Sequence, residues 1–407
     1  MNPAVASAAD AGGIVGPDVV AACGLSAIPG VGATALARVV KKFGGYIAAV
    51  EGGAEKILRF ATELQLRTES IDFLVGKPDL EQLGLEAVAT AKRCHARICV
   101  LGDPWYPPLL RQIDNPPPIL YVRGSLDPDV RRVALVGARD CDAYGLELAR
   151  DIAEGLALAG VQIVSGGARG IDAAAHAGAL WAQGTTVAVT GCGIDVVYPQ
   201  ENAALFDRLG RGGNAVVSEF PPGTPPDKRN FPRRNRTLSG LSSAVVVIRA
   251  ATSSGSLITA NHAAQQKRPL FAVPGAADEP LSAGPNALLT AEAARAVTSA
   301  KDILFHLGWP IPDALNEPEK RSTRKRARVM EPVVKPPEKV GVLEETVLSD
   351  EEVRLFQALD ERSPLHIDEL SLRTRIPVEQ ALTRLTELEM KGLATQRPGK
   401  YFLRRIA

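Results

Sequence analysis

The sequence predicts an α/β protein with a Rossmann-like, mostly parallel central sheet, a helical N-terminal domain and a winged-helix C-terminal domain. Three observations predict this class. The length of 407 residues exceeds one ordinary domain. Between residues 104 and 308, short apolar β-branched runs alternate with helical segments, which is typical of a parallel sheet. The chain ends in three helical segments and two strand-like runs. The apolar runs of the central region are 133–136, 161–165, 186–190, 215–218, 244–248 and 270–273.

The regions on either side of the central one differ in composition. Residues 1–18 are small and featureless, so we expect them to be disordered. Residues 19–103 are predicted to be helical, because Leu36, Val39 and Phe43 recur at helical spacing. Residues 309–348 hold six prolines and a basic run at 320–328, as an extended linker would. A solvated spacer and a weak DNA-binding segment are both compatible with this run.

Residues 349–407 predict the winged helix. Helices are expected to start near Ser349 and Ile367 and after Pro377, and strand-like runs flank residues 397–400. The third helix carries Glu379, Glu387 and other acidic residues beside its basic ones. Duplex DNA binding would need a basic helix, so a protein-contact role is favoured.

Charge and cysteine content limit the possible partners. The net charge is only +1, so nucleic-acid binding must come from local patches. The five cysteines are scattered and lack metal-site spacing, which indicates free thiols of a reducing cytosol. No signal peptide and no apolar run of membrane-spanning length is present. We expect a cytoplasmic protein without membrane contact, metal or cofactor.

Glycine-rich turns follow several of the predicted strands. In a doubly wound sheet such turns meet at the carboxyl edge, where helix N-termini and backbone amides favour anions. No turn carries the dinucleotide fingerprint, and each could instead be a tight corner that requires glycine. The candidate binding residues in these turns are Gly137, Arg139, Gly166, Gly167, Arg169, Ser254, Gly255 and Ser256.

The stretch 228–236 is the strongest binding signal. Five of its nine residues are basic, and Phe231 lies among them. Basic side chains that follow a backbone, with an aromatic ring to stack a base, are typical of single-strand binding. A solvated charged loop is the alternative. The candidates here are Lys228, Phe231, Arg234 and Arg236.

Catalytic motifs are missing from the sequence. Asp172, His176 and Asp195 could suggest an enzyme, but a helix-start aspartate and a structural histidine explain the first two. The sequence has no GxSxG, HExxH or Walker A motif, so we expect no catalytic residue.

Ordered motifs across residues 104–308 resemble the DNA-processing protein A (DprA/Smf) family. The resemblance implies a single-stranded DNA pocket in which Arg139 and Lys228 contact phosphate and Phe231 meets a base, with Arg169, Arg234 and Arg236 as secondary contacts. It further implies protection of incoming DNA in natural transformation, help in loading the RecA recombinase, and a homodimer. The matching stretches include Val136-Gly-Ala-Arg139, Ser165-Gly-Gly-Ala-Arg-Gly-Ile-Asp172, Gly191-Cys-Gly-Ile-Asp195, Phe231-Pro-x-Arg-Asn-Arg236 and Ser254-Gly-Ser-Leu-Ile-Thr-Ala260.

The chain departs from the family pattern at three places. Ala138 replaces the usual serine of the first turn, Arg249 stands where an acidic residue often ends its strand, and Glu292 replaces a small residue. The last two put the local edge of the pocket in question.

Two alternatives remain open. The turn at 28–32 followed by an amphipathic helix resembles a DNA-binding helix-hairpin-helix, but a structural helical hairpin fits as well. The family has a helical domain of sterile-alpha-motif type here, which suits both. The runner-up function is a Rossmann-like nucleotide phosphoribohydrolase of the lysine-decarboxylase-like type, although its PGGxGTxxE motif is missing.

Overall fold

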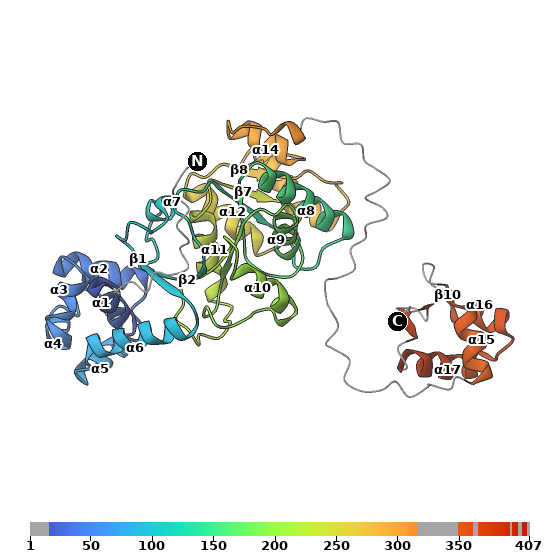
Figure 1. Ribbon diagram of the computed structural model, residues 1–407, viewed down its shortest axis with the longest axis horizontal. Coiled ribbons are helices and arrows are strands. Elements are labelled where there is room, and N and C mark those ends of the chain that lie inside the picture. Colours follow the sequence, from blue (N-terminus) through green and yellow to red (C-terminus); the bar gives the residue numbers. More distant parts are fainter. Residues whose placement is uncertain (1–15, 316–348, 361–364, 391–392, 398–400, 405–407) are drawn as a thin grey trace, which may run out of the picture. The chain divides into compact units, whose positions relative to one another are not determined.

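The computed structural model describes residues 16–315, 349–360, 365–390, 393–397 and 401–404 (Figure 1). The expected disordered start therefore lies almost entirely outside the described residues, as does most of the expected linker. The described residues belong to two compact units, the first with residues 16–315 and the second with those from residue 349 on.

The first unit begins with a group of short helices. Helix α2 is amphipathic and buries Leu36 and Val39, and it ends at Gly44 in the left-handed conformation that favours glycine. Helix α6 starts at Asp79, whose side chain accepts a hydrogen bond from the Gln82 amide. The helices are α1 Pro17–Ser26, α2 Ala33–Phe43, α3 Tyr46–Val50, α4 Gly53–Leu58, α5 Thr68–Val75 and α6 Leu80–Arg93.

A nine-stranded sheet with the order β1-β2-β6-β5-β4-β3-β7-β8-β9 follows. All neighbours from β6 to β9 are parallel, whereas β1–β2 and β2–β6 are antiparallel. The predicted α/β class with a mostly parallel sheet is confirmed. The strands are β1 Arg97–Val100, β2 Ile119–Gly124, β3 Arg132–Val136, β4 Gln162–Ser165, β5 Thr186–Thr190, β6 Ala215–Ser218, β7 Ala244–Val247, β8 Leu270–Ala272 and β9 Arg295–Ala296.

The six apolar runs expected as strands correspond to β3 through β8. The sequence reading missed β1, β2 and β9. Strand β1 lies in the region predicted to be helical, so the sheet starts before residue 104, where the central domain was expected to begin. Its four residues carry too short a period-2 signal to be separated from the preceding helix α6.

Helices cover both faces of the central sheet (Figure 1). Alternate residues of the strands pack against the two helical layers. Val133 and Leu135 pack with α8, α9 and α14, whereas Ala134 and Val136 pack in the core that contains α7, α11 and α12. This alternation follows from the period-2 geometry of a strand buried on both faces. The helices are α7 Pro108–Arg111, α8 Ala143–Leu158, α9 Ile171–Trp181, α10 Ala203–Leu209, α11 Asn230–Gly240, α12 Ser256–Gln265, α13 Ala283–Thr290 and α14 Ala300–His306, with 3₁₀ turns at Gln200–Asn202, Pro280–Ser282 and Asp313–Leu315.

The second unit is a winged helix. Its first helix begins with a capping box, in which Ser349 and Glu352 exchange hydrogen bonds. The three expected helices and the two expected strands are present, and a short third strand joins the sheet in the order β10-β12-β11. The elements are α15 Asp350–Ala358, β10 Leu365–His366, α16 Ile367–Thr374, α17 Val378–Met390, β11 Ala394–Arg397 and β12 Tyr401–Arg404.

Within the described ranges, each helix is either too short or too polar to span a lipid bilayer.

Candidate nucleic-acid interface

A cavity of about 360 Å³ lies at the carboxyl edge of the sheet. The turns after β3, β4 and β5 form its wall, and the first turn of α11 closes it from the side. This is the edge at which ligands bind in open α/β sheets. The lining residues are Arg139, Gly166, Ala168, Arg169, Thr190, Gly191, Cys192, Tyr198, Pro199, Gln200, Glu201, Phe231 and Arg234.

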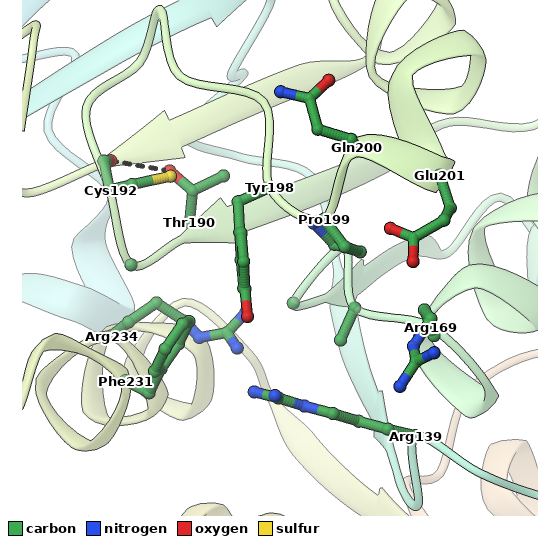
Figure 2. Close-up of a pocket in the computed structure, with 13 residues that line it drawn as sticks. Arg139, Arg169, Thr190, Cys192, Tyr198, Pro199, Gln200, Glu201, Phe231 and Arg234 are labelled. Atoms are coloured by element: carbon green, nitrogen blue, oxygen red, sulfur yellow. Dashed lines mark hydrogen bonds between the residues drawn. The ribbon is translucent and has the colours of Figure 1, made fainter. Parts of the chain in front are cut away.

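Two aromatic rings and two guanidinium groups meet inside the cavity. Figure 2 shows Tyr198 and Phe231 beside each other, with Arg139 extended beneath them. The ring centroids of Tyr198 and Phe231 lie 5.9 Å apart, tilted by 37°. The Arg139 guanidinium carbon is 5.2 Å from the Phe231 centroid, and that of Arg234 is 5.9 Å away. The cavity therefore offers π-faces and cationic donors in the same place.

Arg234 forms the buried base of this arrangement. Only 5% of the residue is exposed, and its Nη1 donates to the Val189 carbonyl at 2.6 Å. A side chain at Gly166 would collide with this guanidinium, and one at Gly191 would come within 2.9 Å of the Phe231 ring. Both turns need glycine because α11 approaches them so closely.

Asp172 organises the turn after β4. Its carboxylate accepts hydrogen bonds from the Gly166 amide at 3.1 Å and the Ala168 amide at 3.4 Å. Burial raises the pKa of Asp172, and the charge of Arg234 opposes that rise. The aspartate thus holds the backbone of the turn in place from inside the protein.

His176 lies one turn further along α9 and is fully buried. Its Nδ1 is 2.7 Å from the Thr186 hydroxyl, which itself donates to the Ile163 carbonyl, so Nδ1 is the donor toward Thr186. Burial lowers the pKa of His176 to about 3. The predicted structural hydrogen bond is confirmed, and the ring does not line the cavity.

The rim of the cavity carries charges of both signs. Arg139 and Arg169 are exposed, and Arg169 pairs with Asp140 at 3.5 Å. Glu201 is the one carboxylate among the lining residues (Figure 2). Three arginines against one exposed glutamate leave the cavity cationic, which favours an anionic ligand.

Five of the twelve expected binding residues line this cavity: Gly166, Arg139, Arg169, Phe231 and Arg234. The other seven lie elsewhere. Lys228 is exposed in the loop before α11, and Gly167 packs against Phe206. Gly137, in the turn after β3, packs against the Ile171 side chain.

The remaining candidates belong to other surroundings. Arg236 points away from the cavity and donates to the Asn115 carbonyl at 2.5 Å. Ser254 and Ser256 bond to each other at 2.7 Å, and the Gly255 carbonyl accepts from Asn235. The turn at 254–256 is thus tied to itself and to α11 rather than open to this cavity.

Sequence reasoning missed Tyr198 as a site residue. Tyr198 follows the matching stretch at residues 191–195, but more than thirty positions separate it from Phe231, and only the fold brings the two rings together. Arg249, the departure at the end of β7, also lies outside the cavity lining. Its side chain is buried, reaches Asp142 at 3.0 Å and Ser282, and lies 5.1 Å from the Tyr144 ring.

The fold and this site define a Rossmann-like protein with a cationic, aromatic cavity at the carboxyl edge of its sheet. The family model described as DNA recombination-mediator protein A matches residues 97–308, and the model of the DprA winged helix domain matches residues 343–400. The chain belongs to this DprA/Smf family, as the sequence motifs predicted.

Individual relatives agree with this assignment. Protein Smf of Escherichia coli strain K12 is 39% identical over 302 residues, which cover 73% of this chain and 74% of that one. The DNA processing protein DprA of Streptococcus pneumoniae strain R6 is 43% identical over 50% of this chain and 71% of its own length. The X-ray structure of DNA processing protein A from Streptococcus pneumoniae matches with a TM-score of 0.58 at 30% identity, covering 72% of this chain and 98% of that chain.

Proposed function

We propose that this protein binds single-stranded DNA in the cavity beside α11. The observation that carries the proposal is the joint placement of Phe231, Tyr198, Arg139 and Arg234 at one opening. Single strands are bound without strong sequence preference by aromatic platforms combined with cationic groups, because every base has a π-face and every nucleotide a phosphate.

The ring geometry specifies how a base would enter. Stacked carbon atoms lie about 3.5–4.0 Å apart, so a base inserted between two rings needs about 7–8 Å. The centroids of Tyr198 and Phe231 are 5.9 Å apart, so the base stacks on the open face of one ring rather than between both. Arg139 now covers a face of Phe231, and its move toward a phosphate would free that face.

Lys228 and Arg169 complete the proposed backbone contacts. Arg169 lines the cavity from the turn after β4, and Lys228 is exposed in the loop before α11, three positions before Phe231. In this proposal the backbone at Gly166 lies close to the DNA, because glycine has no side chain to keep it away. The turns around the cavity are supported by Gly137, Gly167, Arg236 and residues 254–256. The departures Arg249 and Glu292 lie outside the lining.

We propose that the protein is not an enzyme. Asp172 and His176, the two residues that could suggest an enzyme, are 7% and 0% exposed and are held by internal hydrogen bonds. A general acid or base needs to reach its substrate within hydrogen-bond distance. The phosphoribohydrolase alternative would need another residue for that step, and Glu201 is the one carboxylate among the lining residues.

In the cell, we propose that the protein protects incoming single strands during natural transformation and helps to load the RecA recombinase, acting as a cytoplasmic homodimer. Two cavities on one dimer would raise the apparent affinity for a long strand through effective concentration. In this proposal residues 104–308 form the domain that binds single-stranded DNA, and residues 19–103 form a helical domain. Residues 309–348 are a linker, and residues 349–407 form a winged helix that contacts protein.

Titration of the full-length protein with fluorescent oligo-dT tests the binding. Arg139→Glu and Lys228→Glu should each weaken binding at least about tenfold, equal to about 1.4 kcal/mol. Arg211→Glu is the matched control, because Arg211 is exposed and pairs with Asp207 outside the cavity. Unchanged affinity in both test variants would refute the cavity assignment. Release of a base from a nucleoside monophosphate, without oligo-dT binding, would establish the enzyme instead.

A further inference from the structure

A second cavity, of about 510 Å³, lies on the other side of α11. One wall is the turn before α2 together with the first turns of that helix. The opposite wall is α11 with part of α12. This cavity lies between the N-terminal helices and the Rossmann-like part, both of which belong to the first compact unit. The lining residues are Gly30, Gly32, Ala33, Thr34, Ala35, Arg38, Gln65, Arg67, Pro232, Arg233, Arg236 and His262.

Four arginines give this second cavity its charge. Arg38 and Arg67 come from the N-terminal helices, and Arg233 and Arg236 come from α11. The lining contains no carboxylate, although Glu69 pairs with Arg67 at 3.5 Å and the buried Glu219 lies 3.6 Å from Arg236. Burial lowers the pKa of His262, so its ring adds polarity but no charge at neutral pH. The cavity remains strongly cationic.

Backbone amides add donors to the same wall. Gly32 is the N-cap of the eleven-residue helix α2, and no side chain caps the amides of the first turn. Ala33 and Thr34 of this turn line the cavity. The preceding turn is held by Ser70, which is buried and donates to the Pro29 carbonyl at 2.6 Å. The four arginines and the first residues of α2 line the same cavity, which is the combination of donors that binds a phosphate group.

Helix α11 links this cavity to the first one. Phe231 and Arg234 line the first cavity, whereas Pro232, Arg233 and Arg236 line the second, because successive residues point to different sides of a helix. Building on the function proposed above, we propose that the second cavity is a phosphate subsite for the same DNA strand. The strand leaves the base-stacking cavity, crosses the first turn of α11 and places a phosphate against the α2 turn.

The width of the helix sets the length of DNA that the subsite requires. An α-helix with its side chains is about 10–12 Å across. At about 3.4 Å for each stacked nucleotide, the strand needs about three nucleotides to cross it. A very short strand fills only the first cavity, and a longer one reaches both.

Oligonucleotide length separates the two cavities in an experiment on the full chain. Fluorescence anisotropy is measured with oligo-dT of about two nucleotides, too short to cross α11, and of about twenty nucleotides. The double variant Arg67→Glu/Arg233→Glu should lose about tenfold affinity for the longer strand and little for the shorter one. For the longer strand, the slope of log affinity against log salt concentration should fall by about 0.7, because a single strand contributes about 0.7 for each phosphate contact and the subsite holds one phosphate.

Two further variants control for unspecific charge effects. Arg93→Glu changes an exposed arginine of α6 outside both cavities and should leave both strands unaffected. Glu69→Gln removes the carboxylate beside Gly30 and Arg67 and should strengthen binding of the longer strand. A gain of affinity cannot arise from unfolding.

The outcomes distinguish this subsite from the function on which it rests. If the wild type fails to bind either strand, the proposed function fails. If the wild type binds both strands and the double variant weakens neither, the subsite is refuted while the first cavity stands. If the double variant weakens binding of a duplex of equal length but not of the single strand, the second cavity is a duplex site and the proposal is overturned.

Discussion

Acidification should destabilise this protein through the single buried imidazole of His176. The ring is fully buried, its Nδ1 donates to Thr186, and its Nε2 has no hydrogen-bond partner in the structure. Protonation would place an unpaired N–H with a positive charge inside the core, close to Arg234, whose charge also lowers the pKa of the ring.

The size of the effect follows from the pKa of His176, which falls from 6.5 to about 3 on folding. The unfolded chain binds a proton below pH 6.5, and the folded chain does so only near pH 3. Stability from this residue is therefore complete above pH 6.5 and is lost as the pH falls toward 3. The whole loss is about 5 kcal/mol, of which about 2 kcal/mol has occurred at pH 5.

Urea unfolding at pH 7.5 and pH 5, followed by tryptophan fluorescence, measures this loss. All three tryptophans lie in the first compact unit, so the signal reports on the part that contains His176. His176→Asn keeps a donor toward Thr186 but has no titrating group, so it serves as the reference. The stability gap between wild type and variant should narrow by about 2 kcal/mol between the two pH values. Parallel pH profiles would refute the argument.

Other predictions concern the cavity and the thiols. Phe231→Ala should weaken oligo-dT binding by about 1–3 kcal/mol if the ring stacks a base, and a smaller loss in the anisotropy titration would leave the ring a packing role. Gly166→Ala should displace Arg234 and reduce both oligo-dT affinity and the urea midpoint, whereas wild-type values of both would contradict the close approach. Cys23 and Cys99 should react with a thiol reagent at pH 8 only after unfolding, because burial raises the pKa of each to about 12; rapid labelling of the native protein would disprove this.

The local pattern of the chain was enough to predict most of the fold. Strands β3 to β8 are buried on both faces, so each appears in the sequence as a short apolar run. Glycine-rich turns and helical segments between these runs then indicate the α/β order. The same order of motifs placed Arg139 and Arg169 at the carboxyl edge. These features depend on residues that are neighbours in sequence, and periodicity therefore reports them. Strand β1 was not predicted, because its four residues follow a long helix and are too few to show a clear alternation of apolar and polar residues.

Other features of the site depend on contacts between distant residues. The sequence by itself determined that stretch 228–236 is basic and contains Phe231. From the sequence, however, the whole stretch was predicted to form a single binding surface. Tertiary structure divided it: α11 turns Arg234 inward to the first cavity and Arg236 toward the second, and it leaves Lys228 in the preceding loop. It also brought Tyr198 to Phe231. The physical reason is that composition and spacing specify which residues are charged or apolar, whereas the packing of α11 against the sheet and the N-terminal helices decides which way each side chain points.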